Sequence, residues 1–154
     1  MSRNKWVDLK EKVKRYGASV GLDKIGFTDA LPMLDYLPLL IRRQQRGYRY
    51  SINEGDPEKR ITPQAHLPGA RSVICAAVAY GCTDIEPESG TVKRGRMSLI
   101  SRGQDYHLVM RQKLNKLQDF ILSEVPEARV EVMVDTEEIL EKALAVKAGL
   151  GWFG

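Results

Sequence analysis

An acidic residue near the end of the chain, Asp135, is the side chain best placed for chemistry. It directly follows Val130, Val132 and Val134, which alternate as in a half-buried strand. Helical spacing resumes after it, so we expect Asp135 at the carboxyl end of a strand and the amino end of a helix. Ligands of α/β proteins gather at that edge of the sheet, where a carboxyl can transfer a proton. Asp135 and Glu138 also fit a capping box, in which the carboxyl only accepts hydrogen bonds from backbone N–H groups.

Other polar side chains have both a structural and a functional interpretation. Arg60 lies in an irregular stretch, residues 51–70, and is either a surface charge or an anchor for an anion or a cofactor. His107 lies near the start of a predicted helix, as a surface or capping residue or as a ligand. Four arginines form either a solvated face or a contact with nucleic acid, namely Arg42, Arg43, Arg46 and Arg49.

The generic catalytic and cofactor motifs do not occur in the sequence. It has no G-x-G-x-x-G after a strand, no Walker loop, no His-Glu-x-x-His and no Cys-x-x-Cys. The glycine-rich stretch Ala148–Gly154 follows a helix rather than a strand, which argues against a Rossmann phosphate cradle. Cys75 and Cys82 are too few for a disulfide framework and wrongly spaced for a zinc site. We therefore expect a reduced, cytoplasmic protein with Cys75 in its core.

The composition is that of one globular domain. The 154 residues are 43% hydrophobic and 29% charged, with a net charge of +4. This mild positive charge is compatible with a nucleic-acid partner but does not establish one. No apolar run reaches the length of a membrane span and the N-terminus has no signal-peptide layout, so we expect no membrane partner.

Periodicity predicts the elements that must position these residues. Apolar spacing and glycine or proline boundaries predict helices over 4–20, 33–46, 104–124 and about 136–148, and strands over 24–28, 72–80 and 130–134. The strand over 72–80 is almost continuously apolar, which is typical of burial on both faces. We expect a loop over 83–95 and a short extended piece over 97–100. This alternation favours an α/β or α+β layered domain.

Four sequence blocks, taken together, resemble the N-terminal half of the epoxyqueuosine reductases of queuosine biosynthesis in tRNA. The blocks are Arg60-x-x-Pro63 followed by Leu67–Ile74, Gly103–His107, Val134–Thr136 followed by Ile139–Lys142, and Ala145–Trp152 with Gly154. The resemblance implies one domain over 1–154 with the nitroreductase-like, cobalamin-binding fold, a mixed sheet flanked by helices, similar to that of reductive dehalogenases.

The same resemblance implies roles for individual residues. Asp135 matches the proton donor of the family, Arg60, Ser98 and Asp135 match cobalamin contacts, and Tyr106 and His107 lie near the corrin. The family reduces an epoxide to an alkene with two electrons and two protons. Reduced cobalt would supply the electrons, and an acid must protonate the departing oxygen. Burial beside the corrin would favour the protonated carboxyl, whereas a helix N-terminus would favour the carboxylate.

The sequence also departs from that family. Its members normally continue into a ferredoxin-like segment with two 4Fe–4S clusters, each held by four thiolates, and those ligands are absent here. We therefore expect a fragment of a longer chain that needs the cluster domain or an electron-donor protein, with most tRNA contacts in the missing part. Relatives often have Ser-Arg-Tyr where Ser98 precedes Leu99 and Ile100, which leaves another substrate open. Two alternatives are a non-catalytic cobalamin-binding or trafficking module and another corrinoid or flavin reductase of the same fold.

Overall fold

The computed structural model describes residues 3–47, 55–81, 98–101, 103–135 and 138–153. In chain order the elements are α1 (Arg3–Ser19), β1 (Lys24–Asp29), η1 (Leu34–Tyr36), α2 (Leu37–Gln45), α3 (Pro57–Ile61), η2 (Pro63–Ala65), β2 (Ser72–Ala77), η3 (Leu99–Ser101), α4 (Tyr106–Glu124) and α5 (Glu141–Lys147). The predicted loop over 83–95 and Cys82 lie outside the described residues. Within the described part, no helix combines the length and apolar character that a bilayer crossing demands.

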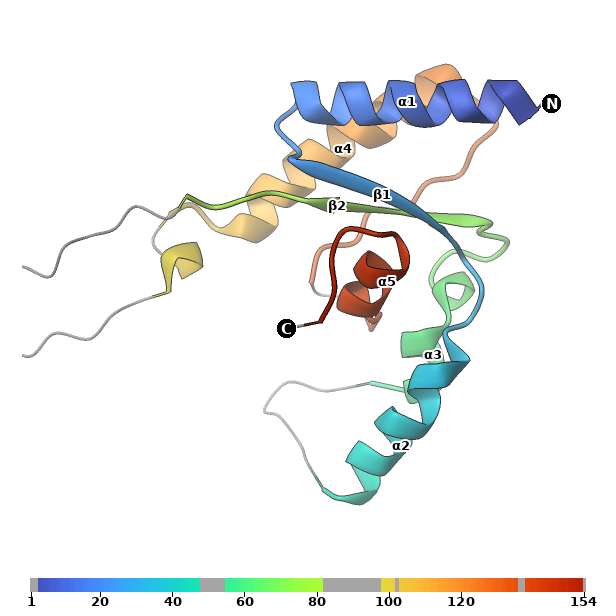
Figure 1. The fold of residues 1–154 in the computed structure, drawn as a ribbon, viewed down its shortest axis with the longest axis vertical. Coiled ribbons are helices and arrows are strands. Elements are labelled where there is room, and N and C mark those ends of the chain that lie inside the picture. The colour runs from blue at the N-terminus through green and yellow to red at the C-terminus, as the bar shows by residue number, and fades with distance from the viewer. Residues whose placement is uncertain (1–2, 48–54, 82–97, 102, 136–137, 154) are drawn as a thin grey trace, which may run out of the picture.

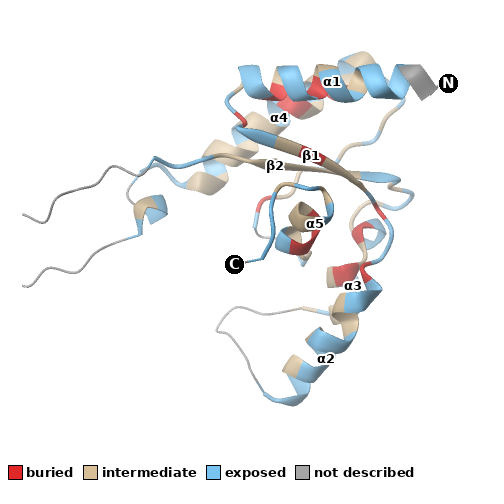
Figure 2. Ribbon diagram, in the orientation of Figure 1, coloured by how far each residue is buried: buried red, intermediate tan, exposed pale blue. Residues whose placement is uncertain are grey.

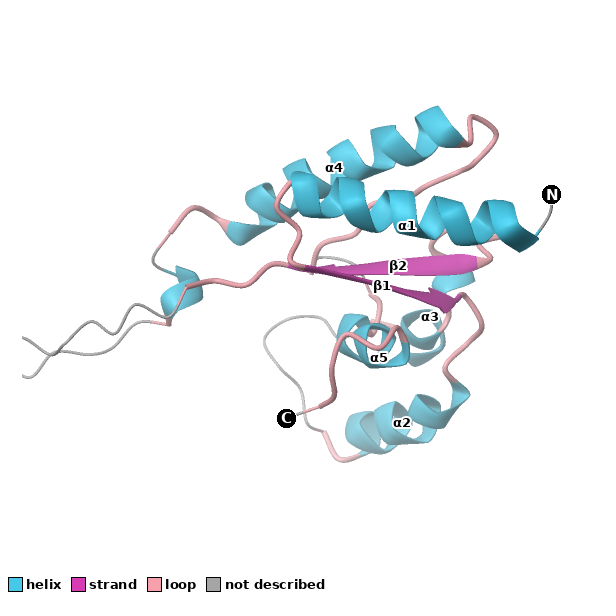
Figure 3. Ribbon diagram, turned by 45° about the horizontal axis from the view of Figure 1, so that its top comes forward, coloured by secondary structure: helices cyan, strands magenta, loops and turns pink. Residues whose placement is uncertain are grey.

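The elements form three layers around a small sheet. Helices α1 and α4 pack together on one face of the strands, and α5 lies against the other face, with α3 and α2 beyond it (Figures 1 and 3). Helices covering both faces of a sheet are the layered α/β arrangement that the order of elements predicts, and this prediction is confirmed.

The sheet is smaller than the sequence predicts. Strands β1 and β2 pair antiparallel, with Lys24 opposite Ala77 and Asp29 opposite Ser72. The expected mixed sheet is therefore an antiparallel pair in the described part of the chain. Every apolar residue of β2 is only half-buried, not enclosed on both faces as expected. The physical reason is that each of two strands keeps one edge without a described partner.

Two apolar clusters hold the layers together. Between α1, α4 and the sheet lie the buried side chains of Val13, Leu22, Leu117 and Ile121. On the opposite face lie Met33, Ile61, Ala143 and Leu144. Figure 2 shows buried segments, in red, on α1, α3 and α5. Helical spacing of apolar residues predicts both α1 and α4 with nearly the observed bounds, because each buries one stripe.

Cys75 lies at the margin of the second cluster and is half-buried. Burial raises the pKa of its thiol to about 11, with the negative charge of Glu141 adding to the effect. The thiol is therefore uncharged near neutral pH, as expected of a structural cysteine rather than a reactive one.

Helix α5 is fixed closely against β1. A Cβ at Gly26 would lie 2.4 Å from the carbonyl oxygen of Ala148, so only glycine permits this approach. Lys147 Nζ lies 2.5 Å from Asp29 Oδ1 and joins the last turn of the helix to the end of the strand. Gly149 follows with φ +76°, and its N–H donates to Val146 O. This is the predicted glycine-terminated helix end.

Several local predictions are wrong. Residues 130–134 form no strand; instead, Gln118 Nε2 of α4 donates to Val130 O at 2.8 Å, where a neighbouring strand would donate. The last helix begins at Glu141 rather than near 136, so Asp135 is not its N-cap. Thr136 and Glu137 lie outside the described residues.

Two shorter stretches also differ from expectation. The irregular stretch contains α3, which Asp56 caps by accepting from the N–H of Glu58, with Pro57 at the first helical position. The expected extended piece over 97–100 ends instead in the 3-10 turn η3.

Candidate active site

The N-terminus of α4 fixes the orientation of His107. Asp105 is the N-cap of this helix, and its Oδ1 accepts from the backbone N–H of His107 at 2.9 Å. The same oxygen lies 2.7 Å from His107 Nδ1. The two hydrogen bonds from His107, ring first and backbone second, lower the pKa of Asp105. Because a carboxylate only accepts, His107 Nδ1 carries a proton and donates it to Asp105, and Nε2 points away from Asp105.

A loop ahead of α5 presents Asp135. This residue has φ +51°, a left-handed conformation that costs a non-glycine residue on the order of 1 kcal/mol and that surrounding contacts must hold. One such contact is the Asp135 N–H, which donates to Glu141 Oε1 at 2.8 Å. Glu141 is the first residue of α5, and buried Ala143 and Leu144 fix that helix in the core. The position of Asp135 is thus tied to a packed helix.

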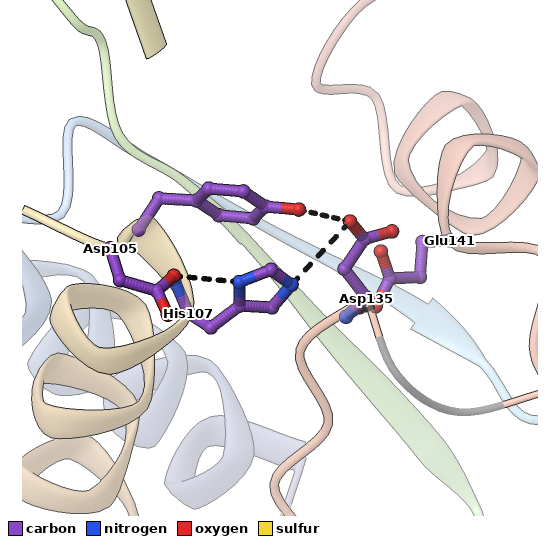
Figure 4. Close-up of polar contacts among 5 residues, drawn as sticks. Asp105, His107, Asp135 and Glu141 are labelled. Atoms are coloured by element: carbon purple, nitrogen blue, oxygen red, sulfur yellow. Dashed lines mark hydrogen bonds and ion pairs between the residues drawn. The ribbon is translucent and has the colours of Figure 1, made fainter. Parts of the chain in front are cut away.

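The two segments meet at the Asp135 carboxyl (Figure 4). The Tyr106 hydroxyl donates to Asp135 Oδ2, and His107 Nε2 lies 3.8 Å from the same oxygen. The rings of Tyr106 and His107 stack with centroids 4.0 Å apart. The hydrogen bond to Asp135 is the main reason that the pKa of Tyr106 rises to about 12. Tyr106 therefore keeps its proton near neutral pH.

This group of side chains is open to a ligand. The Asp135 side chain is 58% exposed and that of His107 is 35% exposed. A carboxyl, a phenol and an imidazole around one point can deliver, accept or relay a proton at a bound substrate. Among the described residues, no three His, Cys, Asp or Glu side chains come together in a way that could hold a metal ion.

Within the described chain, no hydrogen bond or ion pair joins the other two predicted site residues to this group. Arg60 belongs to α3, and its carbonyl oxygen accepts from the N–H of Leu140 at 3.1 Å, so α3 adjoins the segment that leads into α5. Ser98 is exposed, and its carbonyl oxygen accepts from the N–H of Ser101 at the start of η3. Among the described residues, neither the Arg60 guanidinium nor the Ser98 hydroxyl bonds to another side chain. Their roles stay predictions.

Sequence reasoning missed two participants, Asp105 and Glu141. Asp105 carries a readable signal, because an aspartate directly before a helical pattern is a strong N-cap candidate. Glu141 lies in the resembling block Ile139–Lys142, but its contact with Asp135 depends on how the chain turns back between 135 and 141, which no local pattern predicts. The structure brings together three of the five predicted residues, namely Tyr106, His107 and Asp135.

Comparison with protein families gives one clear match. The family model described as "Epoxyqueuosine reductase QueG, DUF1730" matches residues 60–136, which is half of the chain. All five predicted site residues fall in this span. The epoxyqueuosine reductase of Bacillus cereus (strain ATCC 14579) is 40% identical over 148 residues, covering 95% of this chain and 39% of the relative. That of Bacillus subtilis (strain 168) is 40% identical over 146 residues, covering 94% and 38%. The chain spans about two fifths of the length of these relatives.

Solved structures agree with the sequence comparisons. The epoxyqueuosine reductase of Streptococcus thermophilus superposes with a TM-score of 0.88 at 30% identity, covering 96% of this chain and 40% of that one. An epoxyqueuosine reductase with an epoxyqueuosine-modified tRNA-Tyr stem loop gives 0.83 at 39% identity, covering 95% and 39%. The Bacillus subtilis enzyme, with an aspartate catalytic loop swung out of its active site, gives 0.85 at 38% identity, covering 95% and 39%.

Proposed function

Because this chain belongs to the epoxyqueuosine reductase QueG (DUF1730) family, we propose that it is the part of such an enzyme that binds cobalamin and protonates the substrate. The proposed reaction is the reduction of epoxyqueuosine to queuosine in tRNA. One observation carries the proposal. The Asp135 carboxyl accepts a hydrogen bond from the Tyr106 hydroxyl, and the backbone N–H of Asp135 donates to Glu141 on α5. This is the arrangement of a positioned proton donor on an exposed face of the molecule.

The reaction itself requires an acid. Conversion of an epoxide to an alkene breaks both C–O bonds and takes up two electrons and two protons, and the oxygen leaves as water. An oxygen that departs from carbon needs a proton, and a positioned general acid contributes about 10²- to 10⁴-fold to such a step. We assign this proton to Asp135, the exposed carboxyl to which both neighbouring side chains point.

The neighbours of Asp135 have different tasks. Tyr106 retains its proton because its pKa is raised to about 12, so it orients the carboxyl rather than supplying the proton. His107 has its proton on Nδ1, held by Asp105, and its Nε2 faces Asp135 Oδ2 at 3.8 Å. From there the imidazole can exchange a proton with Asp135 after a small shift or through one water molecule.

The side chains present fit the cofactor that the family resemblance implies. Within the described chain the Arg60 guanidinium and the Ser98 hydroxyl have no hydrogen-bond partner, so their donors are available to the amide and phosphate groups around a corrin. We propose that these two residues, with Tyr106, His107 and Asp135, line the cobalamin site. When bound there, cobalamin would supply the two electrons.

Iron–sulfur clusters do not fit this chain. A 4Fe–4S cluster needs four thiolates, and the sequence contains two cysteines, Cys75 and Cys82. No step proposed here passes through a cluster, and the electrons must reach the site from a separate domain or donor protein.

The tRNA partner is supported by a relative. An enzyme 39% identical to this chain binds a tRNA-Tyr stem loop that carries epoxyqueuosine. We extend that partner to this chain, and a tRNA substrate also agrees with the cytoplasmic location predicted from the sequence.

The decisive experiment separates cofactor binding from proton transfer. Cobalamin is titrated into the wild-type chain, Asp135→Asn and Arg60→Ala, and binding is followed by visible absorbance. Reduction of an epoxyqueuosine stem loop is then measured with a low-potential chemical reductant. We expect Asp135→Asn to bind cobalamin like the wild type and to lose at least about 100-fold in rate, and Arg60→Ala to bind cobalamin more weakly.

Three other outcomes of this experiment would contradict parts of the proposed function. Full activity of Asp135→Asn removes Asp135 from the proton-donor role. Cobalamin binding without any reduction favours a binding or trafficking module. Flavin bands in the purified chain favour a flavin reductase of the same fold.

A further inference from the structure

The net charge of this protein is concentrated on one short segment. The chain has 24 lysines and arginines against 20 aspartates and glutamates. Residues 36–53 contain four arginines and no lysine, aspartate or glutamate. The rest of the chain therefore has 20 basic and 20 acidic residues and is balanced. Helix α2 and the residues directly after it carry the entire excess of +4.

Helix α2 has one attached side and one free side. Leu37 and Leu40 pack against the cluster of Met33, Ile61, Ala143 and Leu144, and Gln44 Nε2 donates to Gly55 O at 3.5 Å. At 100° per residue these three side chains share one face of the helix. The helix is therefore fixed to the body of the molecule along one line, on the side of the sheet that carries α5 (Figures 1 and 3).

The opposite face of α2 is basic. Leu39, Arg42 and Arg46 follow each other at steps of three and four and so lie on the side away from that attachment, with Arg43 next to Arg42 at the edge of this side. Arg42 and Arg46 are exposed, and Leu39 is 57% exposed. Figure 2 shows that most of α2 is exposed. Arg43 is half-buried and makes a further interaction, so the surface rests on Arg42 and Arg46. Arg49 lies outside the described residues.

From these observations we propose that the outward face of α2, around Arg42 and Arg46, binds the phosphate backbone of the RNA substrate. This inference rests on the proposed function, which makes a tRNA the substrate. Guanidinium groups bind phosphate oxygens in a bidentate manner, and the segment 36–53 itself contributes no carboxylate that would repel the backbone. Such contacts position an RNA without reading its sequence.

Charge complementarity also distinguishes this surface from the candidate active site. The segment 130–154 contains five acidic residues and two lysines, so the stretch of chain that carries Asp135 is acidic. An RNA that presents one nucleotide to Asp135 must hold its backbone elsewhere, and α2 supplies the compensating charge.

The test compares two double variants with the same net charge. R42A/R46A removes two positive charges from α2. K5A/R15A removes two exposed positive charges from α1, on the other face of the sheet. Binding of an unmodified tRNA-Tyr stem loop is measured from about 50 to 200 mM salt. We expect R42A/R46A to bind about tenfold more weakly, with a salt dependence less steep by about 1.5 in log–log slope. K5A/R15A should stay within about twofold of the wild type, because its charges act only at long range.

The results of this binding test can be distinguished from those that test Asp135 as the proton donor. Equal losses in both variants, no loss in R42A/R46A, or no RNA binding by the wild type would each overturn the assignment to α2. Tighter binding of phosphatidylserine vesicles than of RNA, lost in R42A/R46A, would make the surface a membrane contact and also overturn it. Loss of RNA binding in R42A/R46A alone, together with full activity of Asp135→Asn, would keep the surface and remove the proposed proton donor.

Discussion

At the scale of single residues, the site depends on which side chain holds a proton. Tyr106 and Asp135 are 29 residues apart in the sequence, yet the phenol donates to the carboxyl. The donor in this pair is identified by the pKa of Tyr106, which is raised to about 12. A phenol that keeps its proton up to high pH can hold a carboxyl in place across the whole range in which an enzyme works.

A spectrophotometric titration tests this pair. We expect Asp135→Asn to lower the pKa of Tyr106 toward its ordinary value of 10.0, because the substitution weakens the hydrogen bond from the Tyr106 hydroxyl and removes the neighbouring negative charge. Between pH 10 and 11 the variant should therefore show more phenolate absorbance than the wild type. The same titration of Tyr106→Phe/Asp135→Asn isolates Tyr106 from the other five tyrosines. An identical gain in that double variant would assign the signal to another tyrosine.

The sign of the linked stability follows from the same pKa. The folded state holds the Tyr106 proton to higher pH than the unfolded state does. The contribution of Tyr106 is therefore complete below pH 10 and is lost as pH rises through about 12. We expect the urea midpoint to fall more steeply over this window in the wild type than in Asp135→Asn.

At the scale of elements, the joint between the Asp135 loop and α5 depends on Glu141. Its carboxylate accepts the Asp135 N–H at 2.8 Å and so links a left-handed residue to the first turn of a packed helix. We therefore treat Glu141 as a positioning residue for Asp135.

Two substitutions at Glu141 distinguish positioning from folding. Glu141→Ala removes the acceptor, and we expect kcat to fall about tenfold with cobalamin binding unchanged, since one charge-assisted hydrogen bond to the loop is lost. Glu141→Gln keeps an oxygen at this position and should retain activity within about threefold. The Tyr106 titration gives a second readout. The negative charge of Glu141 also raises the pKa of Tyr106, and both variants remove that charge, so a larger fall of this pKa in Glu141→Ala than in Glu141→Gln would report a loop that leaves Tyr106. Equal loss in both variants would show that the charge of Glu141 matters rather than its position.

The end of α5 offers a test of stability with a built-in control. Gly149 has φ +76°, and a Cβ there would meet nothing within 4 Å. Gly149→Ala should therefore cost only the left-handed conformation, about 1 kcal/mol, seen as a urea midpoint lower by about 0.5 M. Gly151 also has open space around its Cβ position but no positive φ. Gly151→Ala should leave the midpoint unchanged or slightly raise it. Equal effects would refute the conformational explanation.

The elements that sequence reasoning predicted well are those stabilised by their own periodicity. Helices α1 and α4 each bury one apolar stripe, and both were predictable to within two residues. The stretch 130–134 shows the limit of that reasoning. Val134 is buried and Val130 packs against the first cluster, as alternation predicts, but a strand also needs a partner. The Gln118 side chain takes that place at Val130, and no local pattern contains this information.

The candidate site was predictable to the same degree. Its residue types followed from the sequence blocks, but their meeting point did not, because it depends on a contact across 29 residues. The N-cap role expected of Asp135 belongs to a helix that begins only at Glu141.

At the scale of the whole molecule, the helical layers on the two faces of the sheet contribute different parts of the candidate site. One face of the sheet carries α1 and α4, and α4 begins with Asp105, Tyr106 and His107. The other face carries α5, which holds the Asp135 loop, and α2, which holds the basic surface (Figures 1 and 4). The candidate site thus lies where the two helical layers meet beyond the sheet. A change in how either layer packs would separate its parts.

The proposed reaction needs electrons from a donor outside these 154 residues. Two cysteines cannot ligate a 4Fe–4S cluster, and burial raises the pKa of one of them, Cys75, to about 11, which disfavours the thiolate that iron requires. We expect anaerobic treatment with iron and sulfide to leave the chain without the visible absorbance of a cluster.

With cobalamin bound, a small chemical reductant should support reduction of an epoxyqueuosine stem loop, whereas a reduced ferredoxin-type protein should not. The full-length Bacillus subtilis relative, treated in the same way, is the control for both reductants. Steady turnover of this chain with the protein donor would show that electrons enter it without a cluster. The proposal that electron entry requires a separate cluster-containing domain or protein would then be wrong.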